Sequence, residues 1–226
     1  MKGFFITGIG TDVGKTVVSA IVVEALQADY WKPIQCGNLD FTDSDFIEEY
    51  TLHHQTIHDE AYLFEDPVSP HLAAYLSNKN IDNQFIKLPK SNNYLIVEGA
   101  GGLMVPLSQN YLIIDLIKQL QLSVIVVSMN YLGSINHTLL TIESLKYHNI
   151  DIAGIVFNGD ENSSSETFIL QHTGVRLLGK IAKADILSKG FIAHQASSIR
   201  KNLLPLLSPL PNQDTDTNLP IDYESF

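Results

Sequence analysis

The chain has 226 residues, 45% of them hydrophobic, which is enough apolar material for one domain with a full core. Its formal net charge of −11 argues against nucleic acid or an anionic membrane as a partner, because their phosphates would repel it. The single cysteine, Cys36, excludes an internal disulfide and suits a reducing compartment. The sequence has neither a basic leader with a following apolar stretch nor a run of about 20 apolar residues that could cross a bilayer. These features predict a soluble cytoplasmic protein.

Apolar runs alternate with helix-length segments, which predicts one α/β domain with a doubly wound, mainly parallel sheet. Several runs are continuous, as in strands that are buried on both faces. In chain order, the predicted strands are Phe4–Thr7, Tyr30–Ile34, Tyr94–Val97, Val124–Ser128, Ile152–Phe157 and Arg176–Ile181. The predicted helices are Lys15–Ala28, Asp43–Leu52, His71–Leu76, Ile113–Gln121, Ile135–His148 and Ser164–His172. We expect the domain to span residues 1–207, and residues 208–226 to form a disordered acidic tail that contains prolines.

The segment Gly8–Thr16 connects the first predicted strand to the first predicted helix and reads Gly-Ile-Gly-Thr-Asp-Val-Gly-Lys-Thr. Strand, glycine-rich loop and helix form the context of a phosphate-binding loop, in which backbone N–H groups and the helix N-terminus face an anion. Lys15 would reach the terminal phosphates, and the hydroxyl of Thr16 would hold Mg²⁺. The spacing is unusual, since five residues rather than four separate Gly8 from Gly14. The segment therefore predicts a P-loop NTPase-like fold with a nucleotide site.

Charged residues follow other strands, at the edge where ligands bind in such sheets. Glu98 ends the third predicted strand, where it either ligates Mg²⁺ or is a solvated residue in a turn. Lys32 lies late in the second strand, either as a fixed positive charge facing phosphate or as an edge lysine that reaches solvent. Asp45 opens a predicted helix, with Asp43 or Ser44 as the N-cap, and is free to be a second metal ligand.

Four further features leave two interpretations each. Cys36 is a nucleophile or, since no neighbour suits an activating base, a packed thiol beside a ligand. Asn158 ends the fifth strand, where its amide either binds the adenine edge or closes a turn. The segment Gly133–Asn136 begins a helix whose free N–H groups suit a carboxylate, or it only begins a helix. His54 and His58 have i, i+4 spacing but lack a specified partner acid, which favours surface histidines over a zinc site.

Taken together, these motifs resemble the dethiobiotin synthetase family, including its five-residue loop spacing. The resemblance runs in order from residue 1 to about Lys183. It rests on Thr11–Thr16, Lys32-Pro33, Ser44-Asp45, Ser69–His71, Val97–Gly102, Leu132–His137 and Asn158. It implies that 7,8-diaminopelargonate, CO₂ and MgATP are converted to dethiobiotin. A carbamate of one amine would attack the γ-phosphate, and the second amine would close the mixed anhydride to a cyclic urea.

The resemblance also implies roles for individual residues. Thr16, Asp45 and Glu98 would hold Mg²⁺, and Lys15 and Lys32 would stabilise charge on the carbamate and the transferring phosphoryl group. Thr11 and Cys36 would contact the substrate, whose carboxylate would be received by Gly133, Ser134, Ile135 and Asn136 of the other subunit of a homodimer. The residues implied to contact ATP are Asp12, Val13, Gly14, Lys15, Thr16, Val17, Asp45, Glu98, Gly99, Ala100, Gly101, Asn158 and Gly159. Two lysines, acids and a hydroxyl, without an obvious catalytic histidine, suit phosphoryl transfer between anions.

Two positions depart from the family pattern. Cys36 stands where the family commonly has a serine or threonine hydroxyl that contacts the carbamate or phosphate. After Leu178-Gly179 the family usually has an acid, an apolar residue and a proline, whereas this chain has the segment Lys180–Lys183, Lys-Ile-Ala-Lys. The purine contacts of that segment are therefore left open.

Three other classes of protein compete with this interpretation. A dimeric ATPase switch of the partition or septum-site type carries a second lysine early in its phosphate loop, where this chain has Gly10. Such a switch also needs a basic DNA-binding face or a terminal amphipathic helix. An amide-forming synthetase adds a glutaminase domain, for which 226 residues leave no room. A non-enzymatic adaptor would not need to keep Lys15, Thr16, Lys32 and Glu98.

Overall fold

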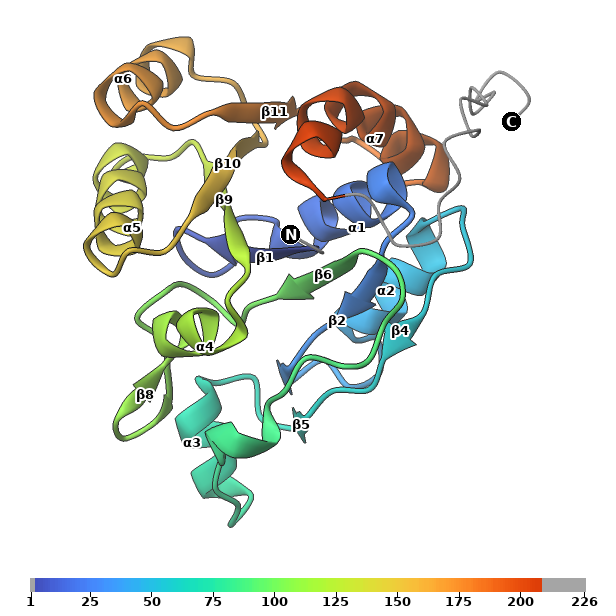
Figure 1. Ribbon diagram of the computed structural model, residues 1–226, viewed down its shortest axis with the longest axis vertical. Coiled ribbons are helices and arrows are strands. Elements are labelled where there is room, and N and C mark those ends of the chain that lie inside the picture. The colour runs from blue at the N-terminus through green and yellow to red at the C-terminus, as the bar shows by residue number, and fades with distance from the viewer. Residues whose placement is uncertain (1–2, 209–226) are drawn as a thin grey trace.

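The continuous apolar runs form one parallel sheet in the computed structural model, which describes residues 3–208 (Figure 1). Within those residues the sheet has seven strands, and each neighbouring pair is parallel. In order across the sheet they are β11 (Leu177–Ile181), β10 (Ile152–Asn158), β9 (Ser123–Met129), β1 (Gly3–Gly8), β6 (Leu95–Glu98), β2 (Asp29–Trp31) and β4 (Ile57–His58). The predicted doubly wound α/β fold is confirmed. The predicted tail begins at Ser208, and its residues 209–226 lie outside the described part of the chain.

Helices cover both faces of the sheet and divide the core into two clusters. The first face packs against α1 (Lys15–Leu26), α2 (Asp43–Tyr50) and α7 (Lys189–Leu203). The second packs against α3 (Pro70–Leu76), α4 (Ile113–Leu120), α5 (Ser134–Tyr147) and α6 (Ser163–Thr173) (Figure 1). Strand β1 shows the division, since Phe4 and Ile6 belong to the first cluster and Phe5 to the second. In residues 3–208, every helix is too short or too polar to cross a membrane.

The predicted strand Tyr30–Ile34 is in fact two strands. Pro33 has no backbone N–H to donate to a ladder, and the chain leaves the main sheet there. Strand β3 (Ile34–Cys36) pairs instead with β5 (Tyr62–Phe64) in a separate two-stranded sheet. A third small sheet joins β7 (Pro106–Ser108) to β8 (Tyr111–Leu112). The break places Lys32 between β2 and β3, with its side chain buried beside the carboxyl end of β6.

Helix α7 is the main element that the sequence prediction lacked. Its buried positions Ile192, Ala196, Ile199 and Leu203 follow helical spacing and pack in the same cluster as α1. The Arg200 guanidinium donates a hydrogen bond to the carbonyl of Ala25 near the end of α1. The helix therefore supports α1 from outside, and α1 in turn begins at the phosphate loop.

Candidate functional site

The loop between β1 and α1 has the conformation that the sequence predicts for a phosphate-binding loop. Gly14 caps α1 with φ 85°, a left-handed backbone that favours glycine. A Cβ at this position would lie 2.1 Å from Asn158 Nδ2, so glycine is also required for space. The side chain of Lys15 folds back over the loop, and its ammonium donates to the carbonyl oxygen of Gly10 at 3.1 Å. The loop is thus closed over the N-terminus of α1.

Lys32 lies at the centre of a buried cluster of charged groups beside this loop. Its ammonium is 2.9 Å from Glu98 Oε1 and 2.5 Å from Asp43 Oδ2. The hydroxyl of Thr16 lies 3.0 Å from both Asp43 Oδ1 and Glu98 Oε1, and its single proton can serve one of them at a time. Tyr30 donates its phenolic proton to Glu98 Oε2 at 2.9 Å. Strands β2 and β6, the phosphate loop and α2 therefore contribute to one site.

Burial and neighbouring charges shift the pKa values of four groups in and beside this cluster. Burial alone would lower the pKa of Lys32, but the Glu98 and Asp43 carboxylates outweigh it and raise that pKa above its ordinary value. Burial would raise the pKa of Asp43, yet the ammonium of Lys32 lowers it. Burial lowers the pKa of Lys15, although Glu98 opposes this. Burial and the neighbouring Glu98 raise the pKa of Tyr30 well above its usual range, so its phenol stays protonated as a hydrogen-bond donor.

The start of α2 differs from the capping arrangement that the sequence suggested. Thr42, not Asp43 or Ser44, is the N-cap of α2. The exposed Asp45 completes a capping box, in which its carboxylate accepts the Thr42 backbone N–H at 2.7 Å. Its pKa is lowered by hydrogen bonds from Thr42. Asp43 is the first residue after the cap, and its carboxylate faces Lys32, so Asp43 lines the cleft whereas Asp45 does not.

A cleft of about 760 Å³ opens over the cluster at the carboxyl ends of the strands. Of the predicted residues it is lined by Thr11, Asp12, Gly14, Lys15, Thr16, Val17, Lys32, Cys36, Glu98, Ala100 and Gly101. The predicted residues that do not line it are Val13, Asp45, Gly99, Gly133, Ser134, Ile135, Asn136, Asn158 and Gly159. Further lining residues, which were not among the predicted site residues, include Gln35, Asn38, Asp43, Ser69 and Pro70. The Ser69-Pro70 part of a recognised motif thus forms a wall of the cleft.

Two predicted segments lie beside the cleft instead of in it. The Asn158 amide donates to the carbonyl of Val13 at 3.0 Å, on the side of the phosphate loop that faces away from Lys32. The segment Gly133–Asn136 begins α5 after β9, next to the fully exposed side chain of Leu132. Both segments are at the carboxyl edge of the sheet.

The Cys36 thiol is half-buried in the cleft, and burial raises its pKa to about 11 although Lys32 lowers it. A thiol with this pKa is a poor nucleophile at neutral pH, which favours the packed-thiol interpretation. Among the histidines, His53 pairs with Glu24 at 3.3 Å and His58 with Asp29 at 3.7 Å. Within residues 3–208 there is no group of three His, Cys, Asp or Glu side chains suited to a metal ion.

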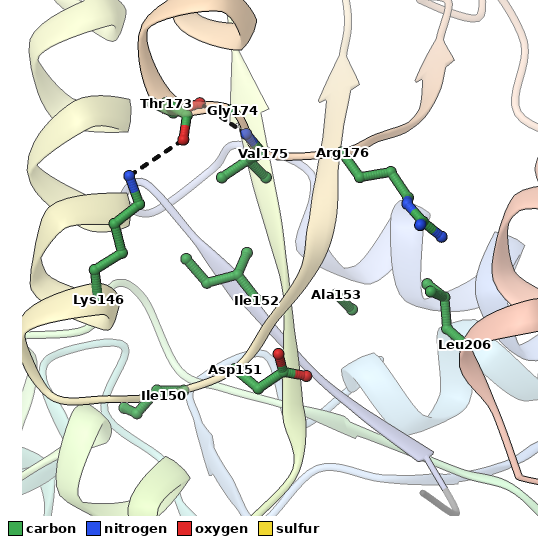
Figure 2. A pocket seen from close by; sticks show the side chains of 10 residues that line it. All are labelled: Lys146, Ile150, Asp151, Ile152, Ala153, Thr173, Gly174, Val175, Arg176 and Leu206. Carbon is green, nitrogen blue, oxygen red and sulfur yellow. Dashed lines mark hydrogen bonds between the residues drawn. The ribbon is translucent and has the colours of Figure 1, made fainter.

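A second cavity of about 570 Å³ opens at the opposite edge, where β10 and β11 begin (Figure 2). Lys146, Asp151, Arg176 and Leu206 are among the residues that line it. Lys146 is held there by the carbonyl of Thr173 at 3.2 Å. None of the predicted site residues lines this cavity, so the candidate chemistry is confined to the carboxyl edge.

Comparisons with known proteins show which family the chain belongs to. Residues 2–189 match the family described as an AAA domain. The ATP-dependent dethiobiotin synthetase BioD of Cytophaga hutchinsonii is 50% identical to this chain over 205 residues, which cover 89% of this chain and 98% of that protein. The chain belongs to the dethiobiotin synthetase family. The protein of the same name from Christiangramia forsetii is 46% identical over 203 residues and is covered to 98%.

Solved structures of other proteins share the fold of this member of the dethiobiotin synthetase family. The cell division ATPase MinD of Pyrococcus furiosus superposes with a TM-score of 0.59, covering 92% of this chain and 100% of that one. The two chains are only 15% identical, so the likeness shows a shared fold and nothing about activity. The loop residue Gly10 accepts the Lys15 ammonium with its carbonyl oxygen at 3.1 Å.

Proposed function

We propose that this chain catalyses the ATP- and Mg²⁺-dependent conversion of 7,8-diaminopelargonate and CO₂ to dethiobiotin. The observation that carries the proposal is the position of Lys32. Its buried ammonium lies between Glu98 and Asp43, in the same cleft as Thr11, Lys15 and the phosphate loop. One cleft therefore has room for a triphosphate and for a second anion that must approach it, and it holds the ammonium groups of Lys15 and Lys32.

The donor set fits Mg²⁺ as the cofactor. The Thr16 hydroxyl lies 3.0 Å from the Asp43 carboxylate and 3.0 Å from the Glu98 carboxylate, so the three groups converge on one place. Mg²⁺ commonly takes one or two carboxylates together with waters and phosphate oxygens, so it does not need a third acidic side chain. We assign these three residues as the ligands, with Asp43 in place of Asp45. The ion would supply positive charge to the phosphates of ATP.

The residues of the chain then support two successive bond changes. A carbamate oxygen attacks the γ-phosphorus of ATP, the bond from that phosphorus to the bridging oxygen breaks, and ADP leaves. The second amine attacks the carbamoyl carbon, phosphate leaves, and the amine releases its proton to solvent. Lys32 has a raised pKa and therefore acts as a fixed cation, not as a base, in both changes. Lys15 would face the terminal phosphates, and Thr11 the reacting end of the substrate.

We further infer a cytoplasmic homodimer. The segment Gly133–Asn136 does not line the cleft of its own chain, which is what a carboxylate receptor for the partner's substrate requires. The fully exposed Leu132 precedes it, and an apolar side chain of that size is suited to burial in an interface. Sedimentation at micromolar concentration should give the mass of two chains. A monomer that makes dethiobiotin at the same rate at all dilutions would contradict the shared site.

Lysine substitutions test the assignment. Purified protein incubated with the diamine, bicarbonate and MgATP should form the cyclic urea, detected by mass spectrometry. Lys32→Ala and Lys15→Ala should each lower its rate by about 100-fold or more, because they remove charge from the transition state. Lys146→Ala, in the cavity at the opposite edge, is the matched control and should keep the rate. ATP hydrolysis without the urea would reject the proposal in favour of a nucleotide switch.

A further inference from the structure

The carboxylate of Glu166 contacts three separate segments at the carboxyl edge of the sheet, outside the cleft. It is on α6 and its side chain is 3% exposed. Its Oε1 accepts the Asn130 amide at 2.7 Å and the Asn162 backbone N–H at 3.0 Å. Its Oε2 lies 2.7 Å from the ammonium of Lys180. The segments after β9, after β10 and within β11 are thus tied to one buried charge.

Contacts of the same group of residues also fix the backbone from Asn158 to Asn162. The Asn130 amide that binds Glu166 also donates to the carbonyl of Asp160 at 2.9 Å. From the other side, the Gly159 N–H donates to the carbonyl of Ile181 at 2.9 Å. This backbone is therefore held from β9 and from β11 at once.

The two sides of the phosphate loop indicate which part of ATP the backbone of residues 158–162 would face. Lys32, Asp43 and Glu98 mark the end of the loop where the reacting phosphate belongs, and they lie on the side of β6 and β2. Asn158 contacts the same loop at Val13, on the side of β9 and β10. If the terminal phosphate lies at the first side, the nucleoside must extend toward the second. This step rests on the ATP site of the proposed function.

We propose that Glu166, with Lys180, is a positioning residue that sets the backbone of residues 158–162 to receive the nucleoside of ATP. Lys180 would then hold the Glu166 carboxylate in place. An acid there would face two carboxylates, Glu161 and Glu166, whereas the lysine is 2.8 Å and 2.7 Å from them.

The ion pairs of Lys180 with Glu161 and with Glu166 differ in how much they contribute to the stability of this region. Glu161 is exposed, so its pair with Lys180 contributes little to the free energy of folding or binding. Glu166 is buried and accepts two further hydrogen bonds, so its loss would leave the donors of Asn130 and Asn162 without their acceptor. Burial would raise the pKa of Glu166, but Lys180 and the other donors hold it below its ordinary value. The carboxylate is therefore charged at neutral pH.

Two ligands separate a nucleoside-positioning role from a general structural one. Isothermal titration calorimetry of the full chain would measure the dissociation constants of MgADP and of Mg-tripolyphosphate, which has no nucleoside. Glu166→Ala should weaken MgADP by about tenfold, the factor that corresponds to one lost charge-assisted hydrogen bond. Glu166→Gln keeps an acceptor, and Lys180→Met keeps the carboxylate, so each should weaken MgADP by only about threefold. Tripolyphosphate affinity should stay within about twofold in all three.

Kinetics and a control pair complete the test. In the three variants the KM for ATP should rise while kcat and the KM for the diamine stay constant. Glu143→Gln and Lys146→Met disrupt an ion pair whose lysine has the same 43% exposure but which lies on α5, and they should change neither affinity. Equal weakening of MgADP and tripolyphosphate, or no change in either, would overturn the proposal. If Glu166→Ala fails to fold, the exposed Lys180→Met decides. A wild-type protein that binds MgADP but forms no dethiobiotin would reject the proposed function and leave this inference standing.

Discussion

The different positions of Asp43 and Asp45 relative to the cleft give the sharpest mutational prediction. The two residues are two positions apart on α2, and Asn is nearly isosteric with Asp at both. Asp43→Asn removes the charge that faces Lys32 and Thr16. Asp45→Asn removes the charge of the capping box and leaves the cleft unchanged.

The distances set the size of the expected effect. At 2.5 Å between Lys32 Nζ and Asp43 Oδ2, Coulomb's law with an effective dielectric constant of about 20 gives roughly 7 kcal/mol of gross attraction. Desolvation of both groups offsets most of it, and a net value of about 2–3 kcal/mol is typical of a hydrogen bond between charged groups. At about 1.4 kcal/mol per tenfold, Asp43→Asn should lower kcat/KM by about 30- to 150-fold. Asp45→Asn should cost at most about 1 kcal/mol of helix capping, or about 3 °C in Tm, with activity kept.

The assay is dethiobiotin formation measured over a range of Mg²⁺ concentrations, with thermal unfolding of the same samples. Asp43→Asn should also require more Mg²⁺ for half-maximal rate, because one of the proposed ligands has lost its charge. The reasoning would be refuted if Asp45→Asn lost as much activity as Asp43→Asn. It would also be refuted if Asp43→Asn kept the wild-type rate and Mg²⁺ requirement.

Three further outcomes follow from the same site. Burial would raise the pKa of Asp43, but Lys32 lowers it below its usual value. The ionised Asp43 therefore stabilises the fold at pH values above its unfolded pKa of about 3.9, and this stabilisation is lost as the pH falls through the folded pKa. The difference in Tm between the wild type and Asp43→Asn should accordingly narrow below about pH 4, and a constant difference down to pH 3 would speak against it. Because burial raises the pKa of Cys36 to about 11, iodoacetamide at pH 8 should alkylate the folded protein about tenfold more slowly than the chain in urea, and equal rates would count against a buried thiol. Gly14→Ala should abolish MgADP binding and cost about 1–3 kcal/mol of folding stability, since φ is 85° and the new Cβ would meet Asn158; calorimetry showing normal binding would contradict this.

The hydrophobic pattern and the glycines of the sequence predicted the elements that are formed by contiguous residues. Strand β1, the glycine loop and α1 are contiguous, and their order and burial follow from the sequence. Helix α7 also has a readable period, Ile192, Ala196, Ile199 and Leu203, which a search for helical spacing beyond β11 would have found. The break at Pro33 was visible as well, because a proline cannot stay in a central strand.

The site was less predictable, because its geometry depends on contacts between distant segments. Whether Asp43 or Asp45 faces the cleft depends on which residue caps α2, and the structure selects Thr42. The partners of Glu98 come from α1, from β2 and from Lys32 just after β2, up to 82 positions away in the chain. Glu166 has no motif at all, and only the fold brings it to Asn130 and Lys180. The sequence predicted which residues could take part in the chemistry, but not which of them contact one another.

The most direct test of the central claim is the fate of bicarbonate labelled with ¹³C and ¹⁸O. The wild-type protein, with diamine and MgATP, should form one ¹³C-labelled cyclic urea for each ADP. The released phosphate should carry one ¹⁸O atom, because a carbamate oxygen attacks the γ-phosphorus. ADP and unlabelled phosphate without the urea would contradict the account.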